Sequence, residues 1–329
     1  MVYHALDCLD DAIEATRAFL LPVDRRRWLT LAVVVFFLSG GSGVSSIPNT
    51  SVNVSGEFDL DGLAAQSLPE LLDQFLPLVV GIAIVFAAVG LLFTLIGSIM
   101  EFVLVDSLRS ESVAVREAMR THLRSGLALF VFRIVLGLVV VAVVGGLAAV
   151  LVVPALGNDT QVLVGALVLV PVALVVGLIA ALVHGLTTNF VVPTMIHDDR
   201  GLVSAWRRFW PVLWNNLAQF ALYVVVRFAL TLGVGIVAGI ATGIAAVVVG
   251  VPFLFLGGAA FLGTGGTISV ASAIVYGLLL ALYVVLLLAV TAVLQVPLKT
   301  FTRYYELLVL GDIESDLDLV ERRRDAIRT

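Results

Sequence analysis

Two arginines, Arg133 and Arg227, lie inside long apolar segments of the chain, where a charged side chain is unusual. A charge at the centre of a bilayer costs about 2.5–3.5 kcal/mol on insertion scales, so ionisable residues at such positions are typically paired or functional. At similar depth on the preceding apolar segments lie Glu101, and His184 with Asn189. We predict that Arg133 pairs with Glu101, and that Arg227 hydrogen-bonds toward His184 or Asn189.

This candidate intramembrane polar cluster has two interpretations. It could be an anion-attracting pocket in the cytoplasmic half of a helical bundle. Alternatively, both arginines snorkel to the interface or close structural ion pairs, and we favour this second interpretation. A neutral residue at position 133 that left folding and every activity unchanged would exclude the pocket.

No catalytic residue, cofactor or metal site is predicted elsewhere. The four histidines are not spaced as metal ligands, and the single cysteine, Cys8, cannot build a thiolate site. No glycine-rich phosphate loop ends in Lys-Ser or Lys-Thr, and no nucleophile elbow is present. We therefore expect neither an enzyme nor a nucleic-acid-binding protein.

The composition is that of a membrane protein. Of 329 residues, 60% are hydrophobic and 13% are charged, and the mean hydropathy is +1.12. Soluble domains carry about 25% charged residues, so this chain lacks the polar surface to face water on all sides. A bilayer core of about 30 Å needs roughly 20 apolar residues per helix, and six segments are predicted to span it: 28–47, 76–104, 126–153, 162–193, 217–249 and 268–298.

The basic residues predict the orientation. All but two of the 19 lysines and arginines lie before the first segment, after the last, or in the second and fourth connections. Basic residues stay on the cytoplasmic side, so both termini are predicted to be cytoplasmic in a multi-pass protein of the cell membrane. The sequons at Asn49, Asn53 and Asn158 then fall in exported loops, as glycan acceptors must.

A unit of one amphipathic cytoplasmic helix and two spans is predicted to repeat three times, over about 5–105, 111–195 and 201–300. Ala15-Thr16-Arg17, Ala118-Met119-Arg120 and Ala205-Trp206-Arg207 occupy matching places in the copies. The fold class is therefore all-α, with three hairpins in one membrane domain, 1–311. Residues 312–329 are predicted to be a charged, solvated cytoplasmic tail.

The amphipathic helices are predicted to lie in the headgroup region and to contact anionic lipid. All four tryptophans, Trp28, Trp206, Trp210 and Trp214, fall on the cytoplasmic side, as interface anchors would. Within the fifth segment, Gly235, Gly239 and Gly243 repeat every four residues, which predicts a flat face for close helix packing.

Two segments carry a family resemblance. Ala5-Leu6-Asp7-Cys8-Leu9-Asp10-Asp11-Ala12 with Phe19-Leu20-Leu21-Pro22, and Tyr304-Tyr305-Glu306-Leu307-Leu308-Val309-Leu310-Gly311-Asp312, resemble an uncharacterised family of haloarchaeal multi-pass membrane proteins. The stretch from Val191-Val192-Pro193 to Ala205-Trp206-Arg207 is similar to the membrane domain that accompanies some glycerophosphodiester phosphodiesterases. The catalytic barrel of those enzymes is absent here, so the resemblance implies a location and a source but no activity.

The sequence favours a non-enzymatic integral membrane protein, acting as a scaffold or a lipid-associated accessory factor. The alternative is a small transporter or channel with a polar path near Arg133 and Arg227. An intramembrane enzyme acting on lipid is the least favoured class, since no acid–base pair sits at a suitable depth. The partner expected from the sequence is the lipid bilayer, with anionic headgroups at its cytoplasmic face.

Overall fold

The computed structural model describes residues 4–39, 68–151, 159–263 and 270–328. Every regular element in these ranges is helical, which confirms the all-α class. The elements are α1 (His4–Leu20), α2 (Arg25–Leu38), α4 (Leu68–Ser110), α5 (Val115–Leu151), α6 (Asp159–Leu186), the π-helical turn η2 (Thr187–Val191), α7 (Val192–Asp198), α8 (Leu202–Asn215), α9 (Leu217–Gly263), α10 (Val270–Ile313), the 3₁₀ turn η3 (Ser315–Leu317) and α11 (Glu321–Arg328).

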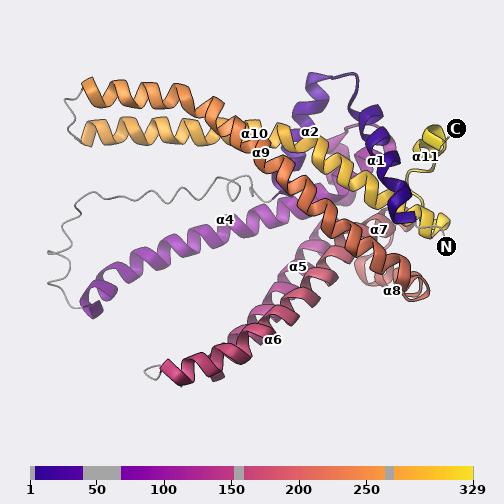
Figure 1. Ribbon diagram of the computed structural model, residues 1–329, viewed down its shortest axis with the longest axis horizontal. Helices are drawn as coiled ribbons and strands as arrows, with labels where there is room; N and C mark the ends of the chain where they lie inside the picture. Colours follow the sequence, from indigo (N-terminus) through magenta and orange to yellow (C-terminus); the bar gives the residue numbers. More distant parts are fainter. Residues whose placement is uncertain (1–3, 40–67, 152–158, 264–269, 329) are drawn as a thin grey trace.

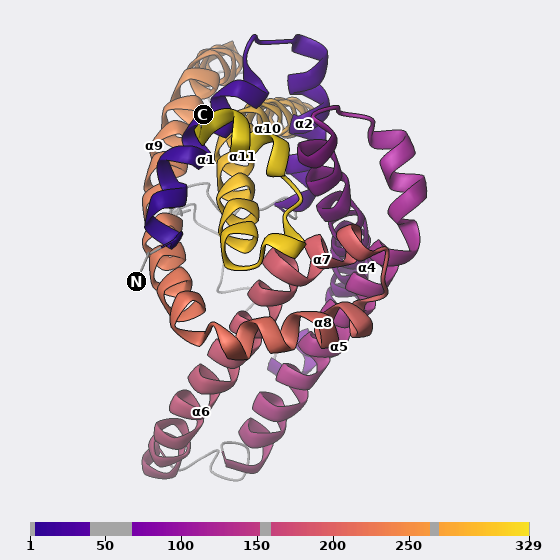
Figure 2. The same ribbon diagram turned by 90° about the vertical axis from the view of Figure 1, so that its right-hand side faces the viewer.

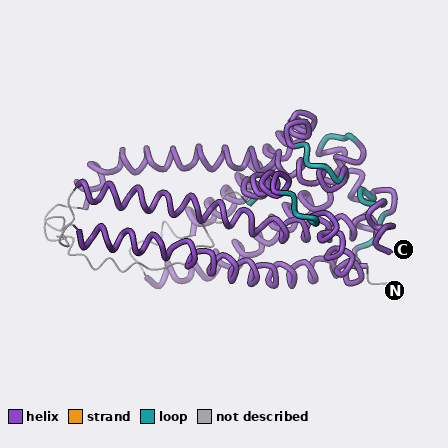
Figure 3. Tube along the Cα trace, turned by 90° about the horizontal axis from the view of Figure 1, so that it is seen from above, coloured by secondary structure: helices purple, strands orange, loops and turns teal. Residues whose placement is uncertain are grey.

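The helices form a base from which long arms extend (Figure 1). The base contains α1, α7, α8, α11 and the adjoining ends of the long helices, with α1 crossing α10. The arms are the α9–α10 hairpin, α4, and the α5–α6 pair, and they splay apart away from the base. Seen end-on, the short helices surround the near end of α10 (Figure 2), and all arms leave in one general direction (Figure 3).

Among the described residues, five segments are long and apolar enough to cross a membrane, namely 76–110, 115–151, 161–198, 217–263 and 272–313. Their large apolar side chains face outward; Leu167 on α6 is 75% exposed and Leu254 on α9 is 76% exposed. Such surface is stable only in lipid or against another apolar surface. The arms are therefore the part of this membrane protein whose length and composition suit it to crossing a bilayer.

The first predicted segment, 28–47, lies partly outside the described residues. Its described part is α2, a helix of 14 residues that begins after the N-cap Asp24, whose carboxylate accepts from the amide of Arg26 at 3.0 Å. Leu31, Val34 and Val35 are buried, because α2 packs against α4 and α10. The three sequons also lie outside the described residues.

The base has a conventional packed core, unlike the arms. Cys8, Ala12, Ala15 and Phe19 follow a spacing of 4, 3 and 4 residues, so they share one face of α1, and each is at most 1% exposed. Deeper in the core, the Phe190 ring lies 4.7 Å from Tyr223 and 5.6 Å from Phe209, centroid to centroid. The interface helices are thus integral parts of the base.

Helix α8 presents three strips along its length. Ala205, Phe209 and Val212 are buried against the base, whereas Trp210 and Trp214 are 49% and 59% exposed. Arg207 and Arg208 occupy the remaining, polar strip. This division suits a helix that contacts protein, lipid and water along separate faces.

The other two predicted tryptophan anchors, Trp28 and Trp206, are less exposed than Trp210 and Trp214 and contact other parts of the base. Trp206 is half-buried and packs against the core. The indole N–H of Trp28 donates to the carbonyl of Leu20 at 3.2 Å, so this side chain braces the turn between α1 and α2.

Two sequence predictions differ from the structure. A Cβ atom added at Gly235, Gly239 or Gly243 would meet no atom within 4 Å, so within the described chain the glycine face packs against no other helix. Residues 312–328 are not a solvated tail, because Leu317, Leu319 and Val320 are at most 7% exposed and α11 folds back beside α1. Spacing reveals a flat or charged face, but not what lies against it.

Replacement of Phe190 by alanine should destabilise the base strongly. Its ring is fully buried between aromatic neighbours, and truncating such a side chain costs about 3–5 kcal/mol. Guanidinium unfolding in detergent measures the change. The matched control is Phe255→Ala on arm α9, where the ring is 75% exposed and the expected cost is below about 0.5 kcal/mol. Equal losses for the two variants would contradict the division into a packed base and unpacked arms.

Candidate functional site

Five charged side chains of alternating sign run through the base in the order Arg133, Glu101, Arg303, Glu306, Arg227. We call this set the charge chain. It joins α5, α4, α10 and α9, with two members on α10. Arg133 Nη2 lies 3.6 Å from Glu101 Oε2, and Arg303 Nη1 lies 2.8 Å from Glu306 Oε2. Arg303 also pairs with Glu101, and Arg227 with Glu306.

The middle of the charge chain is buried and its ends are not. Arg303, Glu101 and Glu306 are 6%, 4% and 2% exposed, whereas the side chains of Arg133 and Arg227 are 16% and 29% exposed. Buried ions must be paired because their desolvation penalty is several kcal/mol each. With three guanidinium groups and two carboxylates, the charge chain has a net charge of +1.

The π-helical turn supplies an additional acceptor for the central arginine. The amide of Val192 donates to the carbonyl of Thr187, and the next residue, Pro193, has no N–H to donate. The carbonyl of Thr188 is thereby left open to a side chain, and Arg303 Nη1 donates to it at 3.1 Å. The insertion of one wide turn beside a proline thus ties α10 to the end of α6.

Two hydroxyl groups accept hydrogen bonds from the terminal nitrogens of Arg133. Its Nη1 donates to Ser98 Oγ at 3.1 Å, and its Nη2 donates to Thr188 Oγ1 at 3.4 Å. Arg133 and Glu101, expected from the sequence to pair, are therefore brought together within a set that also reaches η2. His184 is exposed, and its ring interacts electrostatically with Arg133.

Arg227 has a different partner from the one predicted. In the described residues its ion partner is Glu306, while the side-chain amide of Asn189 donates to the hydroxyl of Tyr223 at 2.9 Å. The Tyr223 ring stacks on Tyr305 with centroids 6.1 Å apart, beside the same carboxylate. Asn189 therefore holds Tyr223, one of the two stacked tyrosines beside Glu306, and its described hydrogen bond is to this tyrosine and not to Arg227.

Sequence reasoning missed Arg303 and Glu306 as members of the site. The predicted sixth segment ended at 298, but α10 continues past Pro297 to Ile313. The spacing of Lys299, Arg303 and Glu306, four and then three residues apart, is that of a single helix face. This periodicity was the signal that could have extended the helix and found the two residues.

The charge chain lies where the apolar arms meet the base. From Glu101 to Leu76, α4 runs about 25 residues, or roughly 37 Å at 1.5 Å per residue. From Arg227 to Gly263, α9 runs about 36 residues, or roughly 54 Å. Both lengths exceed the hydrocarbon thickness of about 30 Å. The charge chain can thus lie at the edge of the bilayer, and the helical segments between it and the far ends of the arms are long enough to cross the hydrocarbon core.

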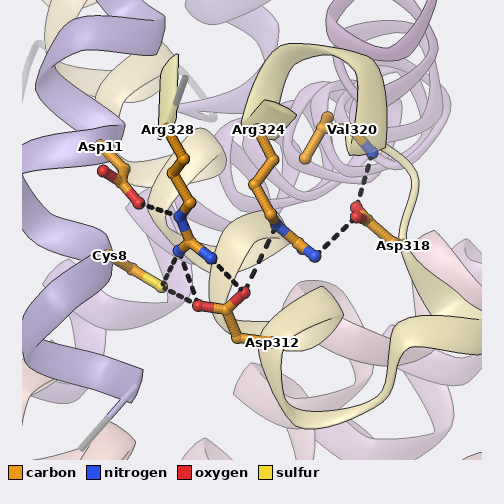
Figure 4. Close-up of polar contacts among 7 residues, drawn as sticks. All are labelled: Cys8, Asp11, Asp312, Asp318, Val320, Arg324 and Arg328. Carbon is orange, nitrogen blue, oxygen red and sulfur yellow. Dashed lines mark hydrogen bonds and ion pairs between the residues drawn. The ribbon is translucent and has the colours of Figure 1, made fainter. Parts of the chain in front are cut away.

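A second polar cluster closes the outer end of the base (Figure 4). Arg328 Nε donates to Asp11 Oδ2 at 2.8 Å, and its Nη2 donates to Asp312 Oδ2 at 2.7 Å. Arg324 Nη1 lies 2.8 Å from Asp318 Oδ2. We call these residues, together with Cys8, the C-terminal clamp. It links α11 to α1 and to the end of α10.

The thiol of Cys8 is held in its protonated form within the clamp. Its Sγ donates to Asp312 Oδ2 at 3.2 Å, and burial together with this carboxylate raises the pKa of Cys8. The hydrogen bonds to Asp312 likewise raise the pKa of Arg328, which keeps it charged. Because the thiolate is the reactive form of cysteine, Cys8 is a structural donor.

A family of unknown function, DUF7544, matches residues 3–320 of the chain. The chain belongs to this family. The match covers nearly the whole sequence and includes all five residues of the charge chain. No curated protein matches the chain, and no solved structure matches it. Membership in DUF7544 is consistent with the predicted uncharacterised family, and the function is inferred from the site.

Neutralising one carboxylate of the charge chain should unfold the base more readily. Glu306→Gln leaves Arg303 and Arg227 facing an uncharged amide, and breaking a buried pair in this way costs about 3–5 kcal/mol. Chemical unfolding in detergent provides the measurement. Glu14→Gln, at an exposed position on α1, should cost below about 0.5 kcal/mol.

The double variant Arg227→Gln with Glu306→Gln supplies the internal check. Removing both charges at the end of the chain leaves fewer ions unpaired, so the double variant should lose less stability than the sum of the single variants. Strict additivity of the two losses would show that these side chains do not interact.

Release of α11 should make Cys8 reactive. The full chain is expected to react slowly with a maleimide, because the only thiol is buried and protonated. Removing residues 321–329 or introducing Arg328→Gln should accelerate labelling, and Arg322→Gln, which lies in α11 outside the clamp, should not. Labelling is followed by mass spectrometry, with the unfolded protein giving full modification. Equal rates in the intact and truncated chains would exclude the clamp.

Proposed function

We propose that the protein is a non-enzymatic integral membrane scaffold that associates with lipid. The observation that carries this proposal is the separation of polar and apolar groups. Paired charges are buried in the base, and the arms expose large apolar side chains along most of their length. A base of this kind fixes where each arm enters the bilayer, while the arms offer wide surfaces to lipid and to other membrane proteins.

The proposed topology has six spans and two cytoplasmic termini in the cell membrane. The sixth span would be completed by the segment that begins with α2, so that three hairpins leave the base. Exposed arginines around the base, such as Arg26, Arg116 and Arg207, support a cytoplasmic position for it, because basic residues are retained on that side. The exposed tryptophans of α8 support the same placement at a membrane surface.

A small transporter or channel is the second candidate. It is favoured by one observation: the charge chain ends in an arginine on both sides, and each of these is partly exposed. An anion that approached either end of the charge chain would contact an arginine, Arg133 or Arg227, before it reached a carboxylate. The two functions differ in whether water reaches the arms, since a transport path must be hydrated along its length.

Cysteine accessibility separates the two functions. Single cysteines are placed along α5 and α9, beyond Arg133 and Arg227, in a Cys8→Ser chain reconstituted in membranes. A scaffold predicts uniform protection from a water-soluble maleimide, because the arms face lipid. Labelling that recurs every three to four residues along one face would contradict the scaffold and support a solute path.

The same approach tests the orientation. Cysteines that replace Arg120 and Arg207 should react from the cytoplasmic side only. Reaction with an impermeant reagent added outside intact cells would refute the proposed topology.

A further inference from the structure

Lys299 is an unpaired cation at the junction of arm and base. It is the only lysine of the chain and is exposed on α10. It lies one helical turn from Arg303, on the same face as Arg303 and Glu306. In the part of the chain that the structure describes, Lys299 has no hydrogen bond or ion pair.

The nearby carboxylates are already engaged. Glu306 is shared between Arg303 and Arg227, and Glu101 between Arg303 and Arg133. Lys299 interacts electrostatically with both Arg227 and Glu306. The charge chain with Lys299 therefore contains four cationic and two anionic side chains, and the surplus is concentrated at the α9–α10 end.

The surroundings of this end are those of a lipid contact. On α10, Val285 and Leu278 lie on the same side of the helix as Lys299, 14 and 21 residues before it, and are 61% and 66% exposed. On α9, Val225 and Phe228 are 65% and 67% exposed. From Lys299 to Val270, α10 runs about 29 residues, or roughly 43 Å, so a bilayer core of about 30 Å fits beyond the lysine. The ammonium group can thus lie at the depth of lipid phosphates, directly above apolar helix surface.

We propose that Lys299 and Arg227 bind the phosphate of an anionic phospholipid whose acyl chains lie along the exposed faces of α9 and α10. Charge complementarity selects an anion, and the apolar surface that continues from the site selects one attached to a hydrocarbon tail. Arg227 can contribute because its side chain is 29% exposed while one terminal nitrogen contacts Glu306. The site deepens the proposed lipid association and rests on it.

The test uses the full chain, purified in a neutral detergent and titrated with phosphatidylglycerol. The thermal unfolding midpoint should rise with phosphatidylglycerol and change less with phosphatidylcholine. In Lys299→Gln the lipid concentration for half the effect should increase roughly tenfold, which corresponds to the loss of one charge-assisted hydrogen bond. Lys299→Arg should retain the response. Arg116→Gln, which removes an exposed arginine of the base, should also retain it.

Three outcomes would overturn the site. An undiminished phosphatidylglycerol effect in Lys299→Gln would place the lipid elsewhere and leave general lipid association standing. Equal stabilisation by inorganic phosphate would show that the cluster binds a free anion without need of a lipid tail. Equal stabilisation by phosphatidylcholine would show that charge does not matter. Because Lys299 is exposed and unpaired, the unfolding midpoint without lipid should be unchanged in Lys299→Gln, which separates binding from folding.

Discussion

The sharing of Arg303 between two buried carboxylates is the interaction on which the rest of the base depends. Glu101 comes from α4 and Glu306 from α10, and each of these carboxylates is also paired with an arginine from a further helix. Apart from the Arg303–Glu306 pair within α10, every pairing in the charge chain needs a neighbouring helix to be in place. Buried ion pairs contribute little net stability, but an incomplete set is strongly unfavourable. We infer that the charge chain selects one register of four helices over its alternatives.

A backbone irregularity makes this arrangement possible. A regular helix would engage the carbonyl of Thr188, whereas the wide turn before Pro193 leaves it to accept from Arg303. The hydroxyl of the buried Tyr223 accepts a hydrogen bond from Asn189, which belongs to the same turn. The π-helical turn thus contributes to both the ionic and the aromatic parts of the core, and a small departure from helical geometry organises contacts among three long helices.

The sequence was sufficient for some features and not for others. Hydropathy located five of the long helices because lipid requires long, uninterrupted apolar runs. The pairing of Arg133 with Glu101 could be anticipated because both were placed at one depth on adjacent segments. The contact of Arg227 with Glu306 could not, because the predicted end of the last segment excluded Glu306. A change from apolar to mixed composition marks the boundary of lipid, whereas the helix itself continues into the base.

The same distinction explains the glycine face of α9 and the folded C-terminal segment. Gly235, Gly239 and Gly243 allow close approach, but association of helices in lipid has no hydrophobic driving force, so a permissive face need not be used within the chain. Conversely, the charged residues of α11 indicated solvation, yet Arg324 pairs with Asp318, and Arg328 pairs with Asp312 and with Asp11 of α1 at the other end of the sequence. Local patterns give the chemistry of a surface, and only the tertiary arrangement gives its partner.

These contrasts explain why the protein concentrates its specific contacts at one end. Arms that are mostly exposed within the chain are surrounded by lipid, which matches their apolar side chains as well as a neighbouring helix would. Their positions therefore have to be set where water, charge and hydrogen bonding discriminate between arrangements, and that place is the base. The charged groups resist movement into hydrocarbon, and the apolar arms resist movement into water. The two requirements together fix the depth of the molecule, and in the lipid site proposed above they hold Lys299 at the level of the headgroup phosphates.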